Sequence, residues 1–147
     1  MLFFKFILIK YYMNQRNKLL LDLRLENIGV VSEQNSTDEN FQNKTLRPIL
    51  KLQNELFLKV YEQYAVKNKN VFFSLNSARK IDYIDYSLTK DFKFRQFMIG
   101  LIVAFFTSDE FDYYTINSSN LNKRIISMLC ERLKSQIELI NSTINNL

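Results

Sequence analysis

Scarcity of glycine and proline constrains this chain most, because it holds only two glycines and one proline in 147 residues. Tight turns depend on these two residues, so a turn-rich β-sandwich, a collagen-like repeat and a Gly-rich linker are excluded. No segment of useful length alternates apolar and polar residues with the period of two that a half-buried strand needs. Hydrophobic residues make up 47% of the chain, which excludes a disordered protein. The sequence therefore predicts an all-α, single-domain bundle of four to five helices with a flexible N-terminal segment.

Apolar residues at helical spacing, together with capping residues, place the expected helices. A long helix begins at a Thr45 cap, with Pro48 in its first turn, and runs to about Val66. Leu52, Leu56 and Leu58 widen its apolar face, which indicates contact from more than one side. Further helices are expected from a Ser74 cap, over Phe92–Phe106 with an Asp91 cap, over Thr107–Thr115 with a Thr107–Glu110 capping box, and from a Ser118 or Ser119 cap. Gly100 lies inside one of these helices, which predicts the close approach of a neighbouring helix.

The chain is expected to divide into four parts. Residues 1–12 are apolar, but no basic residue precedes the run and no small residue marks a cleavage site, so they do not form a signal peptide. Lys5 and Lys10 interrupt the run, which is shorter than the about 20 residues of a membrane-spanning helix. We expect translation to begin at Met13 and residues 1–12 to be an upstream extension, not native structure. Residues 13–43 are then a short helix and a polar linker, 44–140 the helical domain, and 141–147 a frayed tail.

Charge and cysteine content bear on location and partners. The formal net charge is +5, and two of the positive charges lie in the N-terminal run. The excess is spread along the chain, whereas a nucleic-acid-binding surface needs Lys and Arg clustered on one face. The single cysteine, Cys130, excludes an internal disulfide. An unpaired cysteine and the absence of a signal peptide predict a cytoplasmic protein.

The absence of histidine removes the commonest general base and the commonest metal ligand. Cys130 has no histidine to activate it as a nucleophile and is expected to be a buried, small hydrophobic residue. The carboxylates of Asp82 and Asp85 are expected on a solvated helix face, and those near Glu110 at a helix start, where acidic residues are favoured. We therefore predict no catalytic residue, no cofactor and no metal, and lean towards a protein that is not an enzyme.

Polar residues in apolar surroundings are the remaining candidates for contacts with a ligand or partner. Arg95 lies between two phenylalanines, where it either pairs with a carboxylate such as Glu131 or binds an anion. The expected helix start at 118–124 combines free N–H groups with two cations and is a second candidate for an anion. The full set of candidate contacts is Arg47, Asn54, Arg95, Glu110, Asn122, Lys123 and Arg124.

Three stretches, Thr45–Asn54, Lys93–Arg95 and Asn117–Arg124, together resemble a family of small, uncharacterised bacterial proteins of about this length. The resemblance extends over most of Phe41–Gln136. Some members carry an automatic glyoxalase label, which implies paired βαβββ modules and a metal bound by His and Glu or Gln side chains. This chain has no histidine and no strand pattern, so no catalytic residue of a glyoxalase is transferred to it.

These observations favour a non-enzymatic module that binds another protein or associates with itself. The sequence shows no catalytic or cofactor-binding motif, and the long helix has more apolar surface than a chain of this size is expected to bury. One alternative is a weak nucleic-acid-binding helical protein that uses Arg47, Arg79, Lys93, Arg95, Lys123 and Arg124. Another is a bundle that binds a small anion around Arg95 and Glu110; the missing histidine disfavours a glyoxalase-type enzyme. A protein partner or homo-oligomer is expected, and a membrane span is not.

Overall fold

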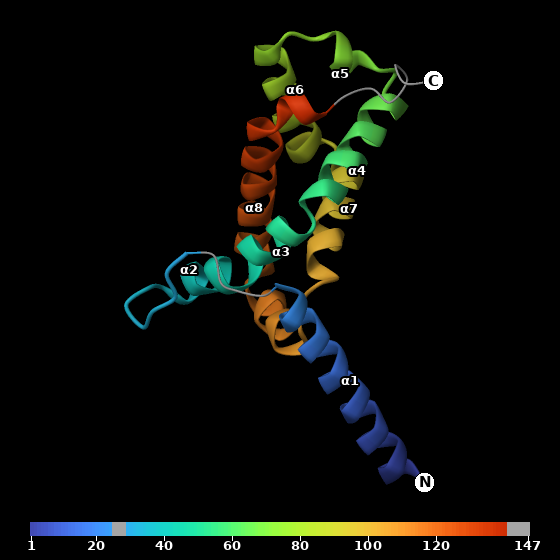
Figure 1. Cartoon of the computed structure of the whole chain (residues 1–147), viewed down its shortest axis with the longest axis vertical. Helices are drawn as coiled ribbons and strands as arrows, with labels where there is room; N and C mark the ends of the chain where they lie inside the picture. The colour runs from blue at the N-terminus through green and yellow to red at the C-terminus, as the bar shows by residue number, and fades with distance from the viewer. Residues whose placement is uncertain (25–28, 141–147) are drawn as a thin grey trace. The chain divides into compact units, whose positions relative to one another are not determined.

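The computed structural model describes residues 1–24 and 29–140, and every regular element in them is helical (Figure 1). The all-α prediction is confirmed, while the predicted frayed tail 141–147 lies outside the described residues. The α-helices are α1 Leu2–Arg24, α2 Thr37–Phe41, α3 Arg47–Leu52, α4 Asn54–Lys67, α5 Val71–Ser74, α6 Ser77–Lys90, α7 Phe92–Val103 and α8 Ser108–Ser135. A π-helical turn, Gln42–Leu46, precedes α3, and a 3₁₀ turn, Ile137–Leu139, follows α8. The prediction of four to five helices was therefore too low.

The described residues group into two compact units. Unit 1 comprises Met1–Leu52 and Leu101–Leu121, and unit 2 comprises Gln53–Gly100 and Asn122–Leu147. The most buried apolar residues of unit 1 include Leu46, Ile49, Leu50, Ile102, Phe106 and Leu121. Those of unit 2 include Phe57, Tyr61, Phe72, Ile84, Leu88, Met98, Ile125, Leu129 and Leu133. Each unit therefore has its own core, built from two distant stretches of the chain.

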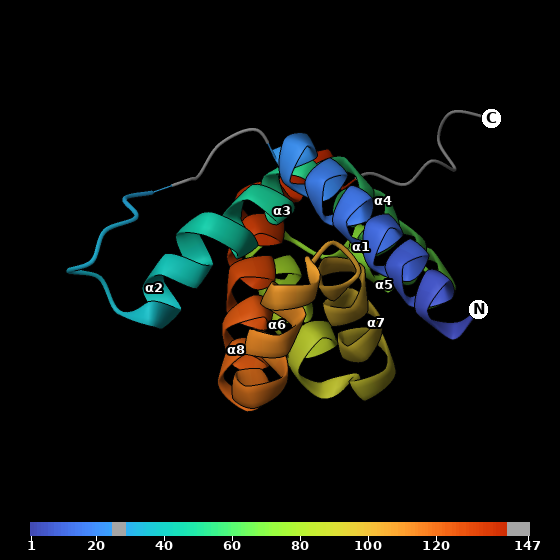
Figure 2. The ribbon, with the colours of Figure 1, turned by 90° about the horizontal axis from the view of Figure 1, so that it is seen from below.

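A helical run in unit 1 occupies part of the region expected to be a linker. Residues 32–43 are polar and without periodicity, yet Thr37–Phe41 form α2 and lead through the π-helical turn into α3 (Figure 2). Ser36 caps α2 by accepting a hydrogen bond from the N–H of Glu39 at 3.1 Å. Phe41 is buried, and its ring meets that of Phe106 edge to face, with centroids 5.6 Å apart. A single buried aromatic residue and a cap thus order a segment that hydrophobic periodicity does not reveal.

The predicted long helix from Thr45 to Val66 is interrupted. Its backbone leaves helical geometry at Gln53, and α4 begins at the next residue. Thr45 lies in the π-helical turn and does not cap a helix, because its hydroxyl donates to Glu110. Leu56 is exposed, so the wide apolar face predicted for this helix is partly open in the described residues.

The start of α6 also differs from the prediction. Asn76, not Ser74, caps this helix, and its side-chain oxygen accepts from the N–H of Arg79 at 3.0 Å. Ser74 instead ends α5, a short turn whose Phe72 is fully buried. The burial of the Phe72 ring stabilises a helical turn in the segment between α4 and α6.

Caps at α7 and α8 are confirmed. Asp91 accepts from the N–H of Phe94 at 3.1 Å. Thr107 and Glu110 form the predicted capping box, with each side chain accepting from the backbone N–H of the other residue. The two helices predicted over Thr107–Thr115 and from a Ser118 or Ser119 cap both lie within α8, and its backbone leaves helical geometry between them, at Asn117. The Asn117 side chain donates to the Tyr113 carbonyl at 3.0 Å.

Gly100 does not have the close neighbour that its place in a helix suggested. A Cβ atom built at this exposed position meets no described atom within 4 Å. We therefore expect Gly100→Ala to raise the free energy of unfolding by about 1 kcal/mol, because alanine loses less backbone entropy in a helix. Urea denaturation measures this change, and a destabilised variant would contradict the open surroundings of Gly100.

Candidate functional site

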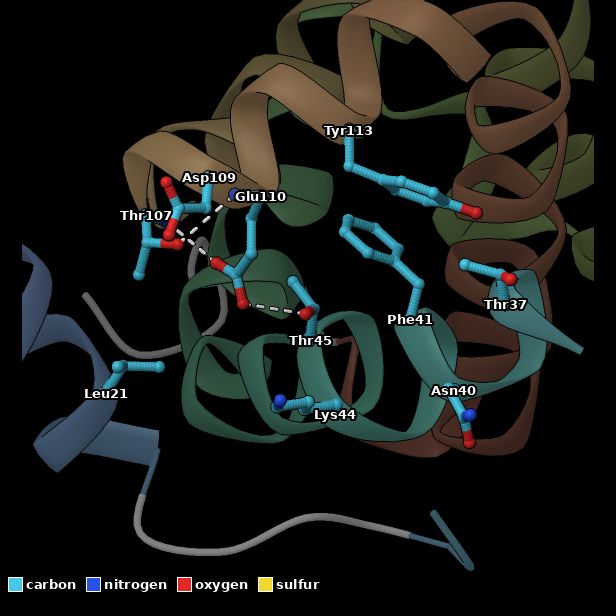
Figure 3. Close-up of a pocket in the computed structure, with 10 residues that line it drawn as sticks. All are labelled: Leu21, Thr37, Asn40, Phe41, Lys44, Thr45, Thr107, Asp109, Glu110 and Tyr113. Carbon is cyan, nitrogen blue, oxygen red and sulfur yellow. Dashed lines mark hydrogen bonds between the residues drawn. The ribbon is translucent and has the colours of Figure 1, made fainter. Parts of the chain in front are cut away.

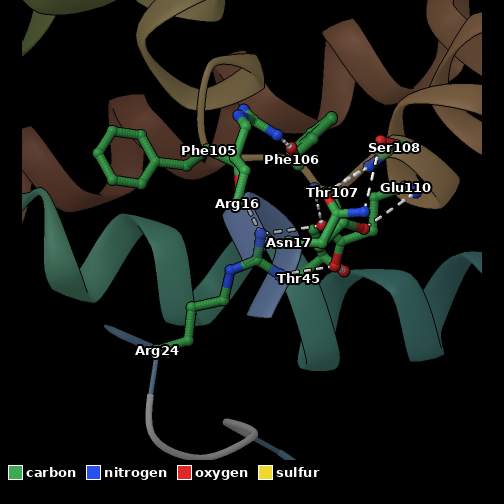
Figure 4. Close-up of polar contacts among 9 residues, drawn as sticks. All are labelled: Arg16, Asn17, Arg24, Thr45, Phe105, Phe106, Thr107, Ser108 and Glu110. Atoms are coloured by element: carbon green, nitrogen blue, oxygen red, sulfur yellow. Dashed lines mark hydrogen bonds and ion pairs between the residues drawn. The ribbon is translucent and has the colours of Figure 1, made fainter. Parts of the chain in front are cut away.

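Four residues of unit 1 form a polar group around Glu110, which we call the Glu110 cluster (Figure 4): Arg24, Thr45, Thr107 and Glu110. Arg24, the last residue of α1, donates from both terminal nitrogens to the two oxygens of Glu110, at 2.6 and 2.8 Å. The Thr45 hydroxyl donates to Oε1 at 2.7 Å, and the Thr107 N–H donates to Oε2 at 2.8 Å. Arg24 also donates to the Phe105 carbonyl. The cluster joins the end of α1, the π-helical turn and the first turn of α8.

The Glu110 cluster is largely removed from water. The side chain of Arg24 is 4% exposed and that of Glu110 is 14% exposed. Burial by itself would raise the pKa of Glu110, but hydrogen bonds from Arg24, Thr107 and Thr45 and the charge of Arg24 outweigh it and hold the pKa below its ordinary value. Glu110 is therefore a carboxylate with all of its donors in place, which suits an anchor better than a general acid or base.

Two further side chains hold α1 to the segment that leads into α8. Arg16 donates to the carbonyls of Phe106 and Ala104, both at 2.9 Å. The Asn17 side chain accepts from the N–H of Ser108 at 3.2 Å (Figure 4). These contacts satisfy carbonyl and N–H groups that would otherwise lack partners between two helices. Half of α1 is thus fixed within unit 1 through polar groups.

A cavity of about 380 Å³ lies beside the Glu110 cluster (Figure 3). The rings of Phe41 and Tyr113 form one wall, with centroids 4.8 Å apart. The Tyr113 hydroxyl donates to Asp38, and burial together with this carboxylate raises the pKa of Tyr113 to about 12. The carboxylate of Glu110 in the wall is already engaged by its donors. The arrangement stabilises unit 1, and Lys44 and Asp109 are further charged residues in the wall of the cavity.

Asn54 belongs to a separate polar group in unit 2. Its side-chain amide pairs with that of Gln136, with N···O distances of 2.7 and 2.9 Å, and its oxygen also accepts from Arg132 at 3.0 Å. Burial lowers the pKa of Arg132. These bonds tie the start of α4 to the end of α8, so the amide predicted to contact a ligand contacts protein groups instead.

Arg95 lines a second cavity, which lies in unit 2 and measures about 400 Å³. Lys123 lines the same cavity, so the structure brings together these two predicted residues. The ion pair of Arg95 with Glu131, one of the two predicted alternatives, is absent from the described residues. The described residues of both units form the ion pairs Arg24–Glu110, Lys59–Glu55 and Lys134–Asp85, and Arg95 takes part in none of these.

The other predicted contacts are dispersed. Arg47 is exposed on α3 in unit 1, whereas Asn122 and Arg124 are half-buried in unit 2 and engaged with other groups. The stretch 118–124 follows Asn117, where the backbone of α8 leaves helical geometry, and the anion site expected there stays a prediction. Glu110 belongs to unit 1 and Arg95 to unit 2, so each forms its own site.

Sequence reasoning missed Arg16, Asn17 and Arg24, the residues of α1 that anchor it. Asn17 and Arg24 lie on one helical face with the half-buried Leu20, at i, i+3 and i+7. A search for apolar stripes passes over this pattern, because two of its three members are polar. Polar residues at core spacing near a helix end are the signal that could have identified it.

Comparisons with known proteins add no relative. The chain matches no family model, no curated protein and no solved structure. In the described residues no group of three or more His, Cys, Asp and Glu side chains is arranged to hold a metal ion.

Proposed function

We propose that this protein is a non-enzymatic helical module that associates with further copies of itself through the N-terminal half of α1. The observation behind the proposal is the exposure of this half, residues 2–13, which we call the apolar segment. Its large apolar side chains are all exposed: Leu2, Phe3, Phe4, Phe6, Ile7, Leu8, Ile9, Tyr11, Tyr12 and Met13. Figure 1 shows this end of α1 extending away from the rest of unit 1.

The apolar segment has no polar face. Its two charges, Lys5 and Lys10, are five positions apart and so lie on different sides of the helix. A helix that is apolar on every side is stable when other elements surround it. Monomeric soluble proteins rarely expose an apolar patch of more than a few hundred Å².

The area of the apolar segment matches that of a stable interface. Five of its side chains are aromatic, and an aromatic side chain buries about 150–250 Å² when it is covered. With the aliphatic residues added, the surface is on the order of the 800 Å² per partner of a standard protein interface. The anchors Arg16, Asn17 and Arg24 hold the adjoining turns of the same helix in place, so the segment is presented with little loss of backbone freedom on binding.

Copies of the same chain are the partner that these features favour. Because the segment is apolar all round, several elements must cover it, and identical helices packed in a bundle cover one another. The long stems of Lys5 and Lys10 allow their ammonium groups to reach water at the edge of such a bundle. A helix that lies on a membrane surface instead needs a strongly polar face, which this segment lacks. Among the described residues, no helix has the length and apolar character needed to cross a membrane.

Self-association is tested by placing a charge in the apolar segment. Phe4→Glu puts a carboxylate in the first turn of α1, where the helix dipole favours it, and so leaves the fold intact. We expect sedimentation velocity to show a dissociation constant about 100-fold higher, because burying a Phe contributes about 2–3 kcal/mol and each 1.4 kcal/mol is tenfold. The matched control is Phe92→Glu, at a 71% exposed Phe in the first turn of α7, which should leave association unchanged.

Three outcomes would argue against self-association through the apolar segment. Equal association of the wild type and Phe4→Glu would place the interface elsewhere. Binding of monomeric protein to vesicles of anionic lipid, lost in Phe4→Glu, would replace the protein partner by a membrane surface. The proposal requires residues 2–12 to be translated, against the expectation that translation begins at Met13. Intact-mass spectrometry of the natural protein identifies its first residue, and a protein that begins at Met13 would lack the apolar segment.

A further inference from the structure

The Arg95 cavity in unit 2 has the charge and size of a site for a small anion. It is lined by residues of α6, α7 and α8, among them Asp85, Arg95, Lys123, Cys130, Glu131 and Lys134. Its volume of about 400 Å³ lies in the range of about 300–1,000 Å³ that small-molecule sites occupy. None of these residues belongs to the apolar segment, so the inference does not depend on self-association.

Arg95 is the unusual group in this cavity. Its Nε atom is buried and has no hydrogen-bond partner among the described residues. Most buried donors in proteins are paired, since an unpaired one costs about 1–3 kcal/mol. In the described residues the Nε of Arg24 is also buried without a hydrogen-bond partner, but the charge of its guanidinium is already neutralised by Glu110. Among the described residues Arg95 has no such carboxylate, and because it lines the cavity, an acceptor from outside the chain fits its terminal nitrogens.

The other charges of the cavity leave a positive balance. Lys134 is paired with Asp85, so these two groups neutralise each other. Glu131 is exposed and accepts a long hydrogen bond of 3.4 Å from the Ser127 hydroxyl. Burial and, to a smaller extent, the negative charge of the nearby Asp85 raise the pKa of Cys130 to about 12. Its thiol therefore adds no negative charge. Arg95 and Lys123 therefore face one exposed carboxylate.

We propose that the Arg95 cavity binds the phosphate group of a small soluble molecule. A guanidinium presents a planar fork of N–H donors that matches two oxygens of a tetrahedral oxyanion, and Lys123 adds a second cation at the wall. The cavity has room for more than the phosphate group itself, so the ligand class is a phosphomonoester of modest size. Ile126 supplies an apolar side chain in the wall for the rest of such a molecule.

Calorimetric titration tests the site, with inorganic phosphate and glycerol 3-phosphate as the probes at low ionic strength. We expect both to bind the wild type, and Arg95→Gln to weaken binding at least tenfold. Lys123→Gln, at an exposed position that does not affect folding, should weaken it several-fold. The matched control is Lys93→Gln, which removes the same charge from an exposed position of α7 outside the cavity and should change the affinity less than twofold.

Several results would overturn the assignment. One is the absence of binding by either probe at 10 mM. Another is a loss of affinity in Lys93→Gln equal to that in Lys123→Gln, because this would show that the anion is attracted by the overall charge and not bound in the cavity. Binding to phosphatidic acid vesicles that soluble glycerol 3-phosphate does not displace would assign the site to a lipid headgroup. If Arg95→Gln does not fold, the affinities of Lys123→Gln and Arg95→Lys for the two probes test the site in its place. Arg95→Lys keeps the charge and loses the fork, so it should weaken binding, and unchanged affinity in both variants would exclude the site.

Discussion

Replacement of Glu110 by glutamine is expected to lower the free energy of unfolding by about 3–5 kcal/mol. The variant leaves the Arg24 guanidinium almost fully buried without its carboxylate, and breaking one side of a buried pair has a cost of this size. It also weakens the acceptor of Thr45 and of the Thr107 N–H. Urea denaturation, followed by circular dichroism, measures the loss.

The control for this variant is Glu55→Gln, because Glu55 forms an exposed ion pair with Lys59 at 3.1 Å. Exposed pairs contribute little, so we expect a change of at most about 0.5 kcal/mol. Losses of similar size in the two variants would show that the Glu110 cluster is not a buried anchor.

The effect of Glu110→Gln should depend on pH in one direction. The pKa of Glu110 is lower in the folded state than its ordinary value, so the unfolded state binds more protons at this group in acid. Its stabilising contribution is therefore complete above the ordinary carboxyl pKa of about 4.3 and is lost as the pH falls through the folded-state pKa. The difference in stability between the wild type and Glu110→Gln should shrink on acidification, and a difference that grows would contradict the shift.

Replacement of Phe41 by alanine is expected to destabilise the protein by about 3–4 kcal/mol. Phe41 is 9% exposed, and its ring contacts Phe106 and Tyr113. Removing a buried aromatic ring loses its transfer free energy and leaves a cavity. Because Phe41 lies in the segment expected to be a linker, a large effect is evidence that α2 packs onto unit 1.

Phe111→Ala is the control for Phe41→Ala. Phe111 is also in unit 1 but is half-exposed, so its removal should cost less than about 1 kcal/mol. Thermal denaturation of both variants gives the comparison. A loss below 1 kcal/mol for Phe41→Ala would mean that residues 37–41 do not form part of the folded unit.

Local signals were predictable from the sequence, because they depend on residues three or four positions apart. The Thr107–Glu110 capping box and the Asp91 cap are of this kind, and both are present. Helical spacing also identified the buried side of α8, where Ile125, Leu129 and Leu133 lie in the core. The all-α class followed from the same local patterns and from the scarcity of turn residues.

Distant contacts were not predictable in this way. Arg24 and Glu110 are 86 positions apart, and nothing in the local sequence of either residue indicates the other. Thr45 has a good cap sequence but donates to Glu110, 65 positions away, so a tertiary contact overrides the local preference. For Arg95, the residue was identified from its apolar neighbours, whereas its cavity required the folded chain.

The most direct test of self-association is the weight-average mass of the full chain, measured by sedimentation equilibrium over a wide range of concentrations. The chain has a mass of 17.6 kDa. We predict a mass that is at least twice this value at micromolar concentration and falls towards it on dilution. A mass of 17.6 kDa at every concentration, with the apolar segment intact, would contradict the proposed function.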